Sequence, residues 1–507
     1  MVSEKQQPPE DLDFLTYSSV PSGKSEGKTH FIIVGAGIIG VCIAYYITHH
    51  PKFDSKKQYI TILESKRVAG GASGKAGGLL ALWAFPQQIV PLSFKLHQDL
   101  AKEYNGEKEW GYRRLTTISI EGDISAKGVA KAAAEAGKQT ENSHVTSSRP
   151  APSRGLSLAN KKNLDEVESK SNSTDIPGTL TWINSGVIKE WSMLGDETTT
   201  AQVHPYQFTT FLLQKCLETG SVELIIGKAE DIIMDEDSGE CEGVIYRPSS
   251  ARAEYDDSSN EKVELLGDKV IMSIGPWTSK ILPDCPISGL RAHSILIKPQ
   301  QMSEITPHAV FTELSLGEHK FVSPEIYSRK DEVYVCGEGD SSVLIPDTTD
   351  DVEVVTEKCD QLFNYVSQIS SNLAHGHVMK RQACYLPVLD IPSSSGPLIG
   401  ETNVANLILA SGHSCWGINN APATGLLVSE ILLDGEAKSC DISALNPSLY
   451  FDASLVYDDD DDDDIDDDDA DDDNHTNDQD DGDESDDEDD TDYKESTEED
   501  EDEHTFL

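Results

Sequence analysis

The sequence predicts an α/β fold in which an antiparallel-sheet (α+β) domain is inserted into a parallel-sheet domain, with a disordered acidic tail at the C-terminal end. Three observations support this prediction. Residues 30–64 read as strand, glycine turn, helix and strand, the order of a parallel βαβ unit. Residues 290–340 hold several strand-like segments separated by turns, and a strand, a glycine loop and a helix return at residues 397–433. A core sheet that the chain leaves and re-enters explains this alternation.

The first unit has the pattern of a Rossmann-type dinucleotide-binding domain. An apolar strand ends at Val34 and meets the turn Gly35-Ala36-Gly37-Ile38-Ile39-Gly40, and a second apolar strand ends in Glu64. The first glycine permits the tight turn, the second lets a pyrophosphate approach the backbone, and the third lets the helix pack close to the sheet. The helix N-terminus offers N–H groups and a positive dipole end to phosphates. Because the carboxylate of Glu64 suits a free ribose 2′-hydroxyl and repels a 2′-phosphate, NAD or FAD is favoured over NADP.

A second glycine-rich segment follows directly after Glu64. Ser65 and Arg67 lead into residues 70–78, five of which are glycine. Such a loop can be a flexible surface segment, or it can present backbone N–H groups to a flat or charged ligand. Its place beside the ribose-binding acid favours the second interpretation.

The remaining segments supply the rest of both domains. Helices are predicted at residues 87–105, 206–218, 351–373 and 421–433, and strands at residues 112–120, 179–191, 222–226, 241–246, 269–274, 397–400 and 407–410. The composition of residues 121–175 predicts a disordered insertion, with at most a solvated helix at residues 127–138. The predicted division is a flexible leader (1–29), segments of the dinucleotide-binding domain (30–111, 201–289 and 385–440), segments of the inserted domain (112–200 and 290–384) and the tail (441–507).

Charge is concentrated at the C-terminal end of the sequence. The chain has a net charge of −51, and residues 458–507 contribute −31 of it, with 32 acidic residues against the single Lys494. Such a segment cannot bury a core, and it repels nucleic acid and anionic lipid. We expect no nucleic-acid partner, and we expect the tail either to keep the chain soluble or to dock a basic protein partner.

Cysteine usage and hydropathy indicate the compartment in which we expect the protein. The nine cysteines are scattered without a CxxC pair, which favours a reducing compartment over a disulfide framework or a zinc site. Residues 1–29 lack the apolar segment of a secretory signal. Residues 31–47 are mostly apolar, but they contain three glycines and fall short of the roughly 20 residues of a membrane span. We therefore expect a cytoplasmic protein with no transmembrane segment and no metal site.

Further motifs give the chain a family resemblance. Residues 273–277 (SIGPW) follow a buried strand, and residues 411–417 (SGHSCWG) join the last strand to the last helix. With the fingerprint and the loop at residues 72–78, they resemble the superfamily of FAD-dependent D-amino-acid, glycine and sarcosine oxidases, over residues 31–114 and 179–434. The loop looks most like that of a group of fungal and plant oxidoreductases, whose fungal members are linked to late endosome-to-Golgi retrieval. The resemblance implies a D-amino-acid-oxidase-like fold, bound FAD and, for the fungal group, a peripheral place on late endosomes.

The resemblance also implies which residues hold FAD. By this resemblance the fingerprint binds the ADP half, and the loop after Glu64 passes the pyrophosphate and the flavin ring. Residues 228–230 present backbone to the adenine, and the turn at residues 411–417 faces the flavin. Ser273 stands where the family usually has alanine. The predicted cofactor-binding residues are Gly35, Ala36, Gly37, Ile38, Ile39, Gly40, Glu64, Ser65, Arg67, Ser73, Gly74, Lys75, Ala76, Gly77, Gly78, Ala229, Ser273, Gly275, Trp277, Cys384, Gly412, His413, Gly417 and Ile418.

Cys384 belongs to this set for a separate reason. Sarcosine-oxidase-like members of the superfamily place a flavin-linking cysteine at a similar point, which implies a possible thioether to the flavin. A buried apolar cysteine is the alternative interpretation, and both remain open at this point.

Three residues are candidates for contact with the substrate. Arg291 begins the inserted sheet and could clamp a carboxylate bidentately, or it could form a structural ion pair. His293 lies two residues further along the same segment. His413 lies beside the predicted flavin, where it could tune the flavin, orient the substrate or be satisfied by the backbone of its own turn. His204, which precedes a proline, is interpreted as a helix cap or a packing group.

Together these observations predict an FAD-dependent oxidoreductase. The resemblance implies that it takes a hydride from the carbon of a C–N bond in a small amine or amino acid, after which the flavin is reoxidised. One alternative is a flavin-binding regulatory protein in endosome-to-Golgi trafficking with little turnover. Another is an NAD-dependent dehydrogenase, which the loops at residues 73–78 and 412–417 disfavour because they match flavin-family positions.

Overall fold

The computed structural model describes residues 15–130, 177–249, 261–392, 394 and 396–454. One sheet of eight strands has the order β10-β9-β8-β2-β1-β11-β19-β18. Its members are β1 (Thr29–Val34), β2 (Gln58–Glu64), β8 (Val222–Met234), β9 (Cys241–Pro248), β10 (Val263–Leu266), β11 (Lys269–Met272), β18 (Leu398–Glu401) and β19 (Leu407–Ser411). The five central strands, β8 to β19 in that order, run parallel, and antiparallel hairpins form both edges.

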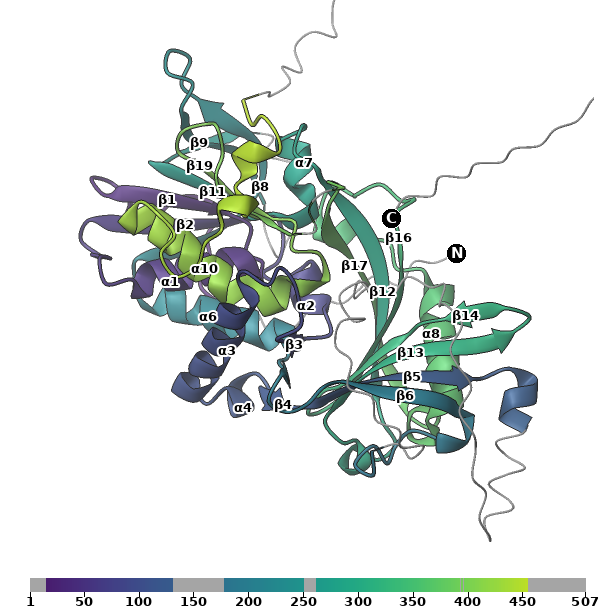
Figure 1. Ribbon diagram of the computed structural model, residues 1–507. Helices are drawn as coiled ribbons and strands as arrows, with labels where there is room; N and C mark the ends of the chain where they lie inside the picture. The colour runs from purple at the N-terminus through teal and green to yellow at the C-terminus, as the bar shows by residue number, and fades with distance from the viewer. Residues whose placement is uncertain (1–14, 131–176, 250–260, 393, 395, 455–507) are drawn as a thin grey trace, which may run out of the picture. The chain divides into compact units, whose positions relative to one another are not determined.

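Helices cover one face of this parallel sheet (Figure 1). They are α1 (Ile38–His49), α3 (Val90–Tyr104), α6 (Pro205–Glu218) and α10 (Gly417–Asp434). Helix α1 contacts both α6 and α10, and eight of its twelve residues are buried. The approach of α10 to α1 depends on Gly425, because a Cβ there would lie 2.6 Å from the backbone of Cys42. A small residue at this position of α10 therefore serves close helix packing.

A proline inside α10 explains how α3 docks on it. Pro422 is the sixth residue of α10, because the helix begins at Gly417 and not at residue 421 as predicted. Proline has no N–H, so the carbonyl of Ile418 loses its usual helical donor. The side chain of His97, on α3, donates to that carbonyl at 2.9 Å from its Nε2 atom. The N–H of Ala423 donates to Ser93 Oγ of the same helix at 3.1 Å.

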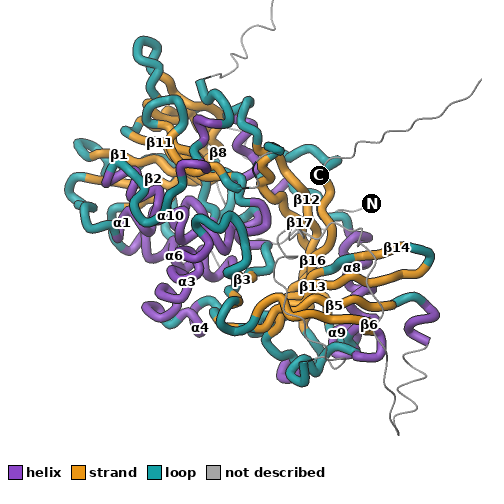
Figure 2. The backbone as a smooth tube through the Cα atoms, viewed as in Figure 1, coloured by secondary structure: helices purple, strands orange, loops and turns teal. Residues whose placement is uncertain are grey.

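The second sheet is mostly antiparallel and lies beside the first (Figure 2). Its order is β17-β12-β16-β15-β13-β5-β6, and β14 pairs with β13. Its members are β5 (Thr116–Asp123), β6 (Ile188–Gly195), β12 (Ile287–Lys298), β13 (His308–Gly317), β14 (Lys320–Val322), β15 (Glu325–Ser328), β16 (Val333–Asp340) and β17 (His377–Leu389). Helices α8 (Thr356–Ile369) and α9 (Ser371–Ala374) pack against it through an aliphatic core. The predicted α/β fold with an inserted antiparallel sheet is confirmed.

Smaller elements connect the two sheets. A three-stranded sheet has the order β3-β7-β4. These strands and the short helices are β3 (Leu79–Ala81), β4 (Arg113–Arg114), β7 (Thr200–Gln202), α2 (Ala72–Lys75), α4 (Gly106–Glu109) and α7 (Thr278–Ile281). The 3₁₀ turns are η3 (Ser185–Val187), η4 (Gly275–Trp277), η5 (Met302–Glu304), η6 (Thr349–Asp351), η7 (Ser414–Trp416), η8 (Ser443–Leu445) and η9 (Pro447–Leu449).

Several predicted elements were wrong in part. Residues 179–184 form no strand, because the side chain of Asn184 caps η3 and β6 begins only after that turn. The helix predicted at residues 351–373 begins at Thr356 and is interrupted at Ser370, whose side chain caps α9. The strand predicted at residues 222–226 pairs with β2, and only the second half of β8 forms the hairpin with β9.

The predicted segment boundaries also need correction. The predicted boundary at 289/290 falls inside β12, and the predicted boundary at 384/385 falls inside β17. The predicted disordered insertion does not begin at residue 121, because residues 121–123 complete β5 and residues 126–130 are helical. Residues 131–175, with most of the helix predicted at 127–138, lie outside the described residues.

Parts of the predicted leader and tail belong to the folded body. Leu15 is buried, and Ser18 bridges to Ile225 at the edge of β8, so residues 15–28 are not a free leader. At the other end, Leu445 and Ala453 are buried in the apolar core. The predicted tail therefore cannot begin at residue 441. Residues 455–507 and 1–14 lie outside the described residues.

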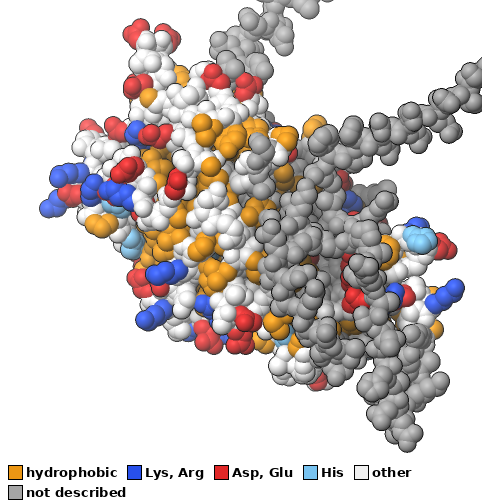
Figure 3. Space-filling model, viewed as in Figure 1, with side chains coloured by type: hydrophobic (Ala, Val, Ile, Leu, Met, Phe, Trp, Pro, Cys, Tyr) orange, Lys and Arg blue, Asp and Glu red, His pale blue; other side chains and the backbone are white. Residues whose placement is uncertain are grey.

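The described residues contain no helix that is both long and apolar enough to cross a membrane. On the face drawn in Figure 3, acidic and basic side chains are interspersed with hydrophobic ones. No group of three or more His, Cys, Asp or Glu side chains that could hold a metal ion is found within the described ranges.

Candidate functional site

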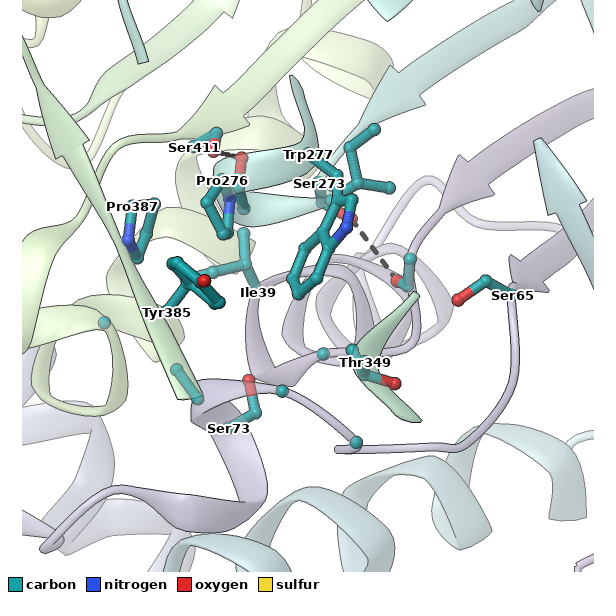
Figure 4. Close-up of a pocket in the computed structure, with 18 of the residues that line it drawn as sticks. Ile39, Ser65, Ser73, Ser273, Pro276, Trp277, Thr349, Tyr385, Pro387 and Ser411 are labelled. Atoms are coloured by element: carbon teal, nitrogen blue, oxygen red, sulfur yellow. Dashed lines mark hydrogen bonds between the residues drawn. The ribbon is translucent and has the colours of Figure 1, made fainter. Parts of the chain in front are cut away.

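A cavity opens at the carboxyl ends of the parallel strands, the place where ligands bind in open α/β sheets. Its empty space, part of which is open to solvent, amounts to about 1260 Å³. Figure 4 shows the side chains around it: Ile39 of α1, Ser73 of α2, Trp277 of η4, Thr349 of η6 and Tyr385 of β17. The cavity thus extends from the nucleotide-binding fingerprint to the second sheet.

The fingerprint forms one wall through its backbone. Gly35 has a φ of +103°, and a Cβ on it would lie 2.8 Å from the carbonyl oxygen of Ser273. A Cβ on Gly40 would lie 2.2 Å from the carbonyl oxygen of Gly35. Helix α1 begins behind Gly37 without a side-chain cap, and the N–H of Ile38 donates to Ser73 Oγ at 2.9 Å. The positive end of an uncapped helix therefore lies at the cavity, where it suits phosphate groups.

Glu64 is held at the cavity by a set of donors. It is buried, and its carboxylate accepts from the backbone N–H groups of Ala36 at 2.9 Å and Lys66 at 3.0 Å. The hydroxyl of Ser65 donates to it at 3.0 Å. Burial raises the pKa of Glu64, and these hydrogen bonds act in the opposite direction. The strand end, the turn and the acid are thereby fixed as one unit.

Ser273 joins β1 to β11 beside this wall. Its hydroxyl donates to the carbonyl of Val34 at 2.8 Å and lies 3.3 Å from the carbonyl oxygen of Gly35. The serine in place of the family's usual alanine therefore has a structural role, because it ties together the ends of two parallel strands.

A segment that the sequence analysis did not identify covers part of the cavity. The indole N–H of Trp277 donates to the carbonyl of Pro346 at 2.7 Å. Asp347 lines the cavity and forms ion pairs with Lys280 at 3.0 Å and Lys228 at 3.6 Å. These contacts attach the segment after β16 to the nucleotide-binding side.

The same segment continues through Thr349 and Asp350. Arg67 donates from Nε to both carboxylate oxygens of Asp350 at 2.9 Å. Thr349 lines the cavity, and its buried hydroxyl has no hydrogen-bond partner within the described residues. An unpartnered hydroxyl at the cavity is available to a bound ligand. In sequence, only the fixed helix-capping pattern Thr-Thr-Asp-Asp at 348–351 could have drawn attention to this turn.

His413 lies on the loop between β19 and α10, and it also lines the cavity. Burial lowers its pKa to about 3, so the imidazole is neutral at physiological pH. Its Nε2 atom lies 3.0 Å from the hydroxyl of Thr424, and that hydroxyl donates to the carbonyl of Asn420 at 3.1 Å. The imidazole therefore donates from Nε2 to Thr424, an interaction that fixes the ring toward α10.

Comparison with known proteins identifies the family. The chain matches the family described as "DAO: FAD dependent oxidoreductase" over residues 30–431. "Putative oxidoreductase TDA3" of Saccharomyces cerevisiae is 46% identical over 524 aligned residues, which cover 88% of this chain and 99% of the yeast protein. This chain belongs to the DAO family of FAD-dependent oxidoreductases. "Putative oxidoreductase C1F5.03c" of Schizosaccharomyces pombe is 31% identical, with 82% of this chain and 97% of that protein covered.

Solved structures of the DAO fold resemble the chain at low sequence identity. Glycine oxidase from Geobacillus kaustophilus has a TM-score of 0.56 at 15% identity and covers 83% of this chain and 98% of its own. L-amino acid deaminase from Proteus myxofaciens has a TM-score of 0.57 at 15% identity, with 85% and 95% covered. Iminodiacetate oxidase from Chelativorans sp. BNC1 has a TM-score of 0.55 at 16% identity, with 82% and 98% covered. At these identities the likeness supports the fold, and the predicted D-amino-acid-oxidase-like architecture is confirmed.

The residues of the DAO-family cavity fit FAD. An uncapped helix N-terminus suits the pyrophosphate, and the buried carboxylate of Glu64 suits a ribose hydroxyl. In Figure 4, Ser65 lies on one side of the cavity and Tyr385 and Pro387 lie on the other, so the cavity also reaches the second sheet. When bound, FAD supplies the capacity to accept a hydride.

Most of the predicted cofactor-binding residues line this cavity. Those that do are Gly35, Gly37, Ile38, Ile39, Glu64, Ser65, Arg67, Ser73, Ala76, Ala229, Ser273, Gly275, Trp277, His413, Gly417 and Ile418. Those that do not are Ala36, Gly40, Gly74, Lys75, Gly77, Gly78, Cys384 and Gly412. The sequence analysis missed lining residues on strand ends and on the second sheet, among them Leu63, Gly227, Pro276, Thr349, Tyr385, Leu386, Pro387 and Cys415.

The loop residues that do not line the cavity have other contacts. Lys75 donates from Nζ to the carbonyl of Ala383 at 3.1 Å, and burial lowers its pKa. Arg329 of the second sheet donates to the carbonyls of Ala76 and Gly77. The loop after Glu64 is therefore attached to the second sheet by its backbone carbonyls and by a lysine side chain.

Two of the three predicted substrate-contacting residues lie elsewhere. Arg291 is buried in an ion-paired cluster, 3.0 Å from Asp340 and 2.8 Å from Glu353, and it does not line the cavity. His293 accepts from the backbone N–H of Val355 at 3.0 Å, and burial lowers its pKa to about 4. The structural ion pair considered for Arg291 is thus the arrangement found.

Two further expectations can be compared with the structure. Cys384 is buried and does not line the cavity, and burial raises the pKa of its thiol to about 11. His204 caps α6 as predicted: its side chain accepts from the N–H of Gln207 at 3.5 Å.

Proposed function

We propose that this FAD-dependent oxidoreductase oxidises the C–N bond of a small amine or amino acid. The observation that supports the proposal is that one cavity is lined both by Glu64 of the fingerprint and by Tyr385, Leu386 and Pro387 of the second sheet. A cofactor whose nucleotide half lies at Glu64 would present its other end to this second sheet. The names of several solved structures with the same fold, glycine oxidase and L-amino acid deaminase among them, are consistent with a substrate of this class.

The chain's own residues would position the reactants. The N-terminus of the 18-residue helix α10 lines the cavity at Gly417 and Ile418, and its positive dipole end favours negative charge there. His413 stays neutral and holds its loop against Thr424. A hydride leaves the substrate carbon only when the neighbouring nitrogen can share its lone pair, so the amine must be neutral when it reacts.

The test is an absorbance spectrum of the purified protein, followed by anaerobic addition of a panel of amines and amino acids. We expect a yellow protein whose flavin absorbance is bleached by at least one panel member. A protein that binds FAD but is bleached by no member would contradict the proposal. That outcome would instead favour the alternative of a flavin-binding regulatory protein in endosome-to-Golgi trafficking.

Location and partner are further parts of this proposal. We propose a cytoplasmic protein that associates peripherally with late endosomes, and an acidic C-terminal segment that docks a basic protein. Fluorescence microscopy and affinity purification of the full chain and of a chain lacking residues 458–507 would test both. Unchanged location and unchanged partners in the shortened chain would leave the segment as a device for solubility.

A further inference from the structure

The connection that follows β16 of the second sheet crosses to the nucleotide side of the cavity. It joins β16, which ends at Asp340, to α8, which begins at Thr356, and it includes the short turn η6. Two of its residues, Asp347 and Thr349, line the cavity. We call residues 344–350 the strap.

The strap is attached to both sides of the cavity. At one end, the hydroxyl of Tyr385 on β17 donates to the carbonyl of Leu344 at 2.9 Å. At the other end, Asp350 accepts from Arg67, which follows Glu64 of the fingerprint. The residues that the strap contacts through these and the intervening hydrogen bonds and ion pairs line the cavity themselves: Arg67, Lys228, Trp277, Lys280 and Tyr385. The strap therefore spans the cavity from the second sheet to the fingerprint.

Thr349 packs against the glycine loop that follows the fingerprint. A Cβ on Gly70 would lie 2.7 Å from its Oγ1 atom, and a Cβ on Gly71 would lie 3.6 Å from its Cγ2 atom. The hydroxyl is buried and has no hydrogen-bond partner in the part of the chain that the structure describes. Figure 4 shows the side chain among those that surround the cavity. Because a buried hydroxyl normally has a partner, we expect a bound molecule to supply one.

The neighbours of the strap belong to the nucleotide half of the site. Arg67 follows Glu64, the acid that suits a ribose hydroxyl. Lys228 lies two residues beyond Ile226, the residue of β8 that pairs with Glu64. The missing partner of Thr349 is therefore expected among the ribose and phosphate oxygens of the ADP half of FAD.

The ion pairs at the centre of the strap are exposed to solvent. The side chain of Asp347 is 70% exposed, and those of its partners Lys228 and Lys280 are 36% and 37% exposed. The side chain of Leu344, at the start of the strap, is exposed as well. Exposed ion pairs contribute little stability, and salt screens them. The strap is thus held by contacts that water and salt can replace.

We propose that the strap closes over the ADP half of bound FAD and must detach for FAD exchange. In the closed state, the hydroxyl of Thr349 donates to a ribose or phosphate oxygen of the cofactor, and the ion pairs of Asp347 hold the strap in place. Cofactor exchange does not involve the substrate, so this role is independent of the proposed C–N oxidation.

Exchange of bound FAD for added, isotopically labelled FAD in the holoprotein tests the role of Thr349. Thr349→Val keeps the shape of the side chain and removes its hydroxyl. We expect it to speed the exchange, measured by mass spectrometry of the bound flavin, about three- to tenfold, the effect of one lost hydrogen bond. Thr349→Ser, which keeps the hydroxyl, should exchange FAD at close to the original rate. Exchange in Thr349→Val at the original rate would overturn the proposed contact.

The ion pairs of Asp347 test whether the strap retains the cofactor. Removal of a negative charge beside the phosphates of FAD should, by charge alone, slow its release. If the pairs hold the strap closed, Asp347→Asn should instead speed the exchange, by about two- to fivefold. In the original chain the exchange should also become faster between about 0.05 and about 0.5 M salt, and Asp347→Asn should reduce that dependence.

Asp237→Asn is the matched control for this change. Asp237 is an exposed acid in the turn between β8 and β9 and does not line the cavity, so the variant should exchange FAD as the original chain does. Thermal unfolding of each holoprotein shows whether the variant has folded. Because Asp347 is exposed, Asp347→Asn decides the question even if Thr349→Val does not fold. Slower or unchanged exchange in Asp347→Asn would overturn the proposal.

Discussion

The two walls of the cavity are built in different ways. The wall on the first sheet consists of backbone: glycines whose missing side chains make room, a helix N-terminus, and one acid, Glu64, held by N–H groups. The wall toward the second sheet consists of side chains, with Thr349, Tyr385 and Pro387 arriving from η6 and β17. A cofactor that many enzymes share can be bound by a compact local motif, whereas a substrate specific to one enzyme is recognised by side chains from distant segments.

The largest effect should come from filling the space that the backbone wall needs. A Cβ at Gly40 would lie 2.2 Å from the carbonyl oxygen of Gly35, so Gly40→Val must displace the turn or the helix. We expect loss of FAD from the purified protein and a fall in Tm of more than about 5 °C, the size associated with ~2 kcal/mol in a large domain. Absorbance at the flavin bands and thermal unfolding measure both.

The control for this change is Gly178→Val. That glycine has no atom within 4 Å of the position of a Cβ and no positive φ. It should keep its FAD and its Tm. If Gly40→Val also retained FAD, the close approach of helix and turn would not be what holds the cofactor.

The second effect should come from the single acid of the backbone wall. Glu64→Ala removes the acceptor of the N–H groups of Ala36 and Lys66 and the predicted contact with the ribose. A buried donor left without an acceptor costs about 1–3 kcal/mol. We expect FAD affinity to fall by about 10- to 100-fold, measured by fluorescence titration of the apoprotein. Glu223→Ala serves as the control, because this acid lies on β8 opposite Thr61 of β2 and does not line the cavity, and the variant should bind FAD as the original chain does.

The difference between the walls also explains how much the sequence could predict. The fingerprint residues, Ser73 and the loop at 411–418 were predicted because their spacing along the chain is fixed by contacts within one strand–turn–helix unit. Tyr385 and Thr349 were not predicted, because neither belongs to a motif of fixed spacing. They reach the cavity only through the pairing of β17 with β12 and the contact of Arg67 with the residue after Thr349. For Arg291 the sequence left a substrate contact and a structural ion pair open, because its acidic partners at positions 340 and 353 could not be read from the sequence.

The ends of helices and strands were hard to predict for the same reason, because contacts between distant segments decide them. Residues 179–184 alternate in a strand-like way, yet the cap that Asn184 provides decides their structure. The helix predicted at residues 421–433 ends within one residue of the end of α10, but it starts four residues too late. A proline normally marks the first turn of a helix, and Pro422 lies deeper in α10 because His97 donates to the carbonyl that the proline leaves without a donor. Tertiary contacts override local pattern at both places.

A smaller effect concerns acid stability, to which two buried histidines contribute, His413 at the cavity and His293 on β12. Burial lowers the pKa of His413 to about 3 and of His293 to about 4, from about 6.5 in the unfolded chain. The unfolded chain therefore takes up protons that the folded protein does not as the pH falls from about 6.5 toward 4. The stability that these neutral histidines contribute is fully present above pH 6.5 and decreases below it.

Thermal unfolding between pH 4 and 8 checks this expectation. Tm should fall below about pH 6.5, and His293→Gln and His413→Gln should each make the fall shallower. Only the second variant, which alters the cavity lining, should also shift the flavin spectrum. Steepening of the fall in either variant would show that the histidine is protonated in the folded protein.

The smallest effect is expected at Cys384, the residue for which a covalent bond to the flavin was considered. Cys384 lies on β17, one residue before the cavity-lining Tyr385, and Lys75 is the nearest charge acting on it. Because burial raises the pKa of its thiol to about 11, little thiolate is present at neutral pH to attack the flavin. We expect acid precipitation to release all of the flavin into the supernatant, and Cys384→Ala to bind FAD within about twofold of the original chain. Flavin that stays with the precipitated protein, but is released from Cys384→Ala, would show instead that β17 of the second sheet binds the cofactor covalently. The first sheet would then not be the only part of the protein that holds FAD.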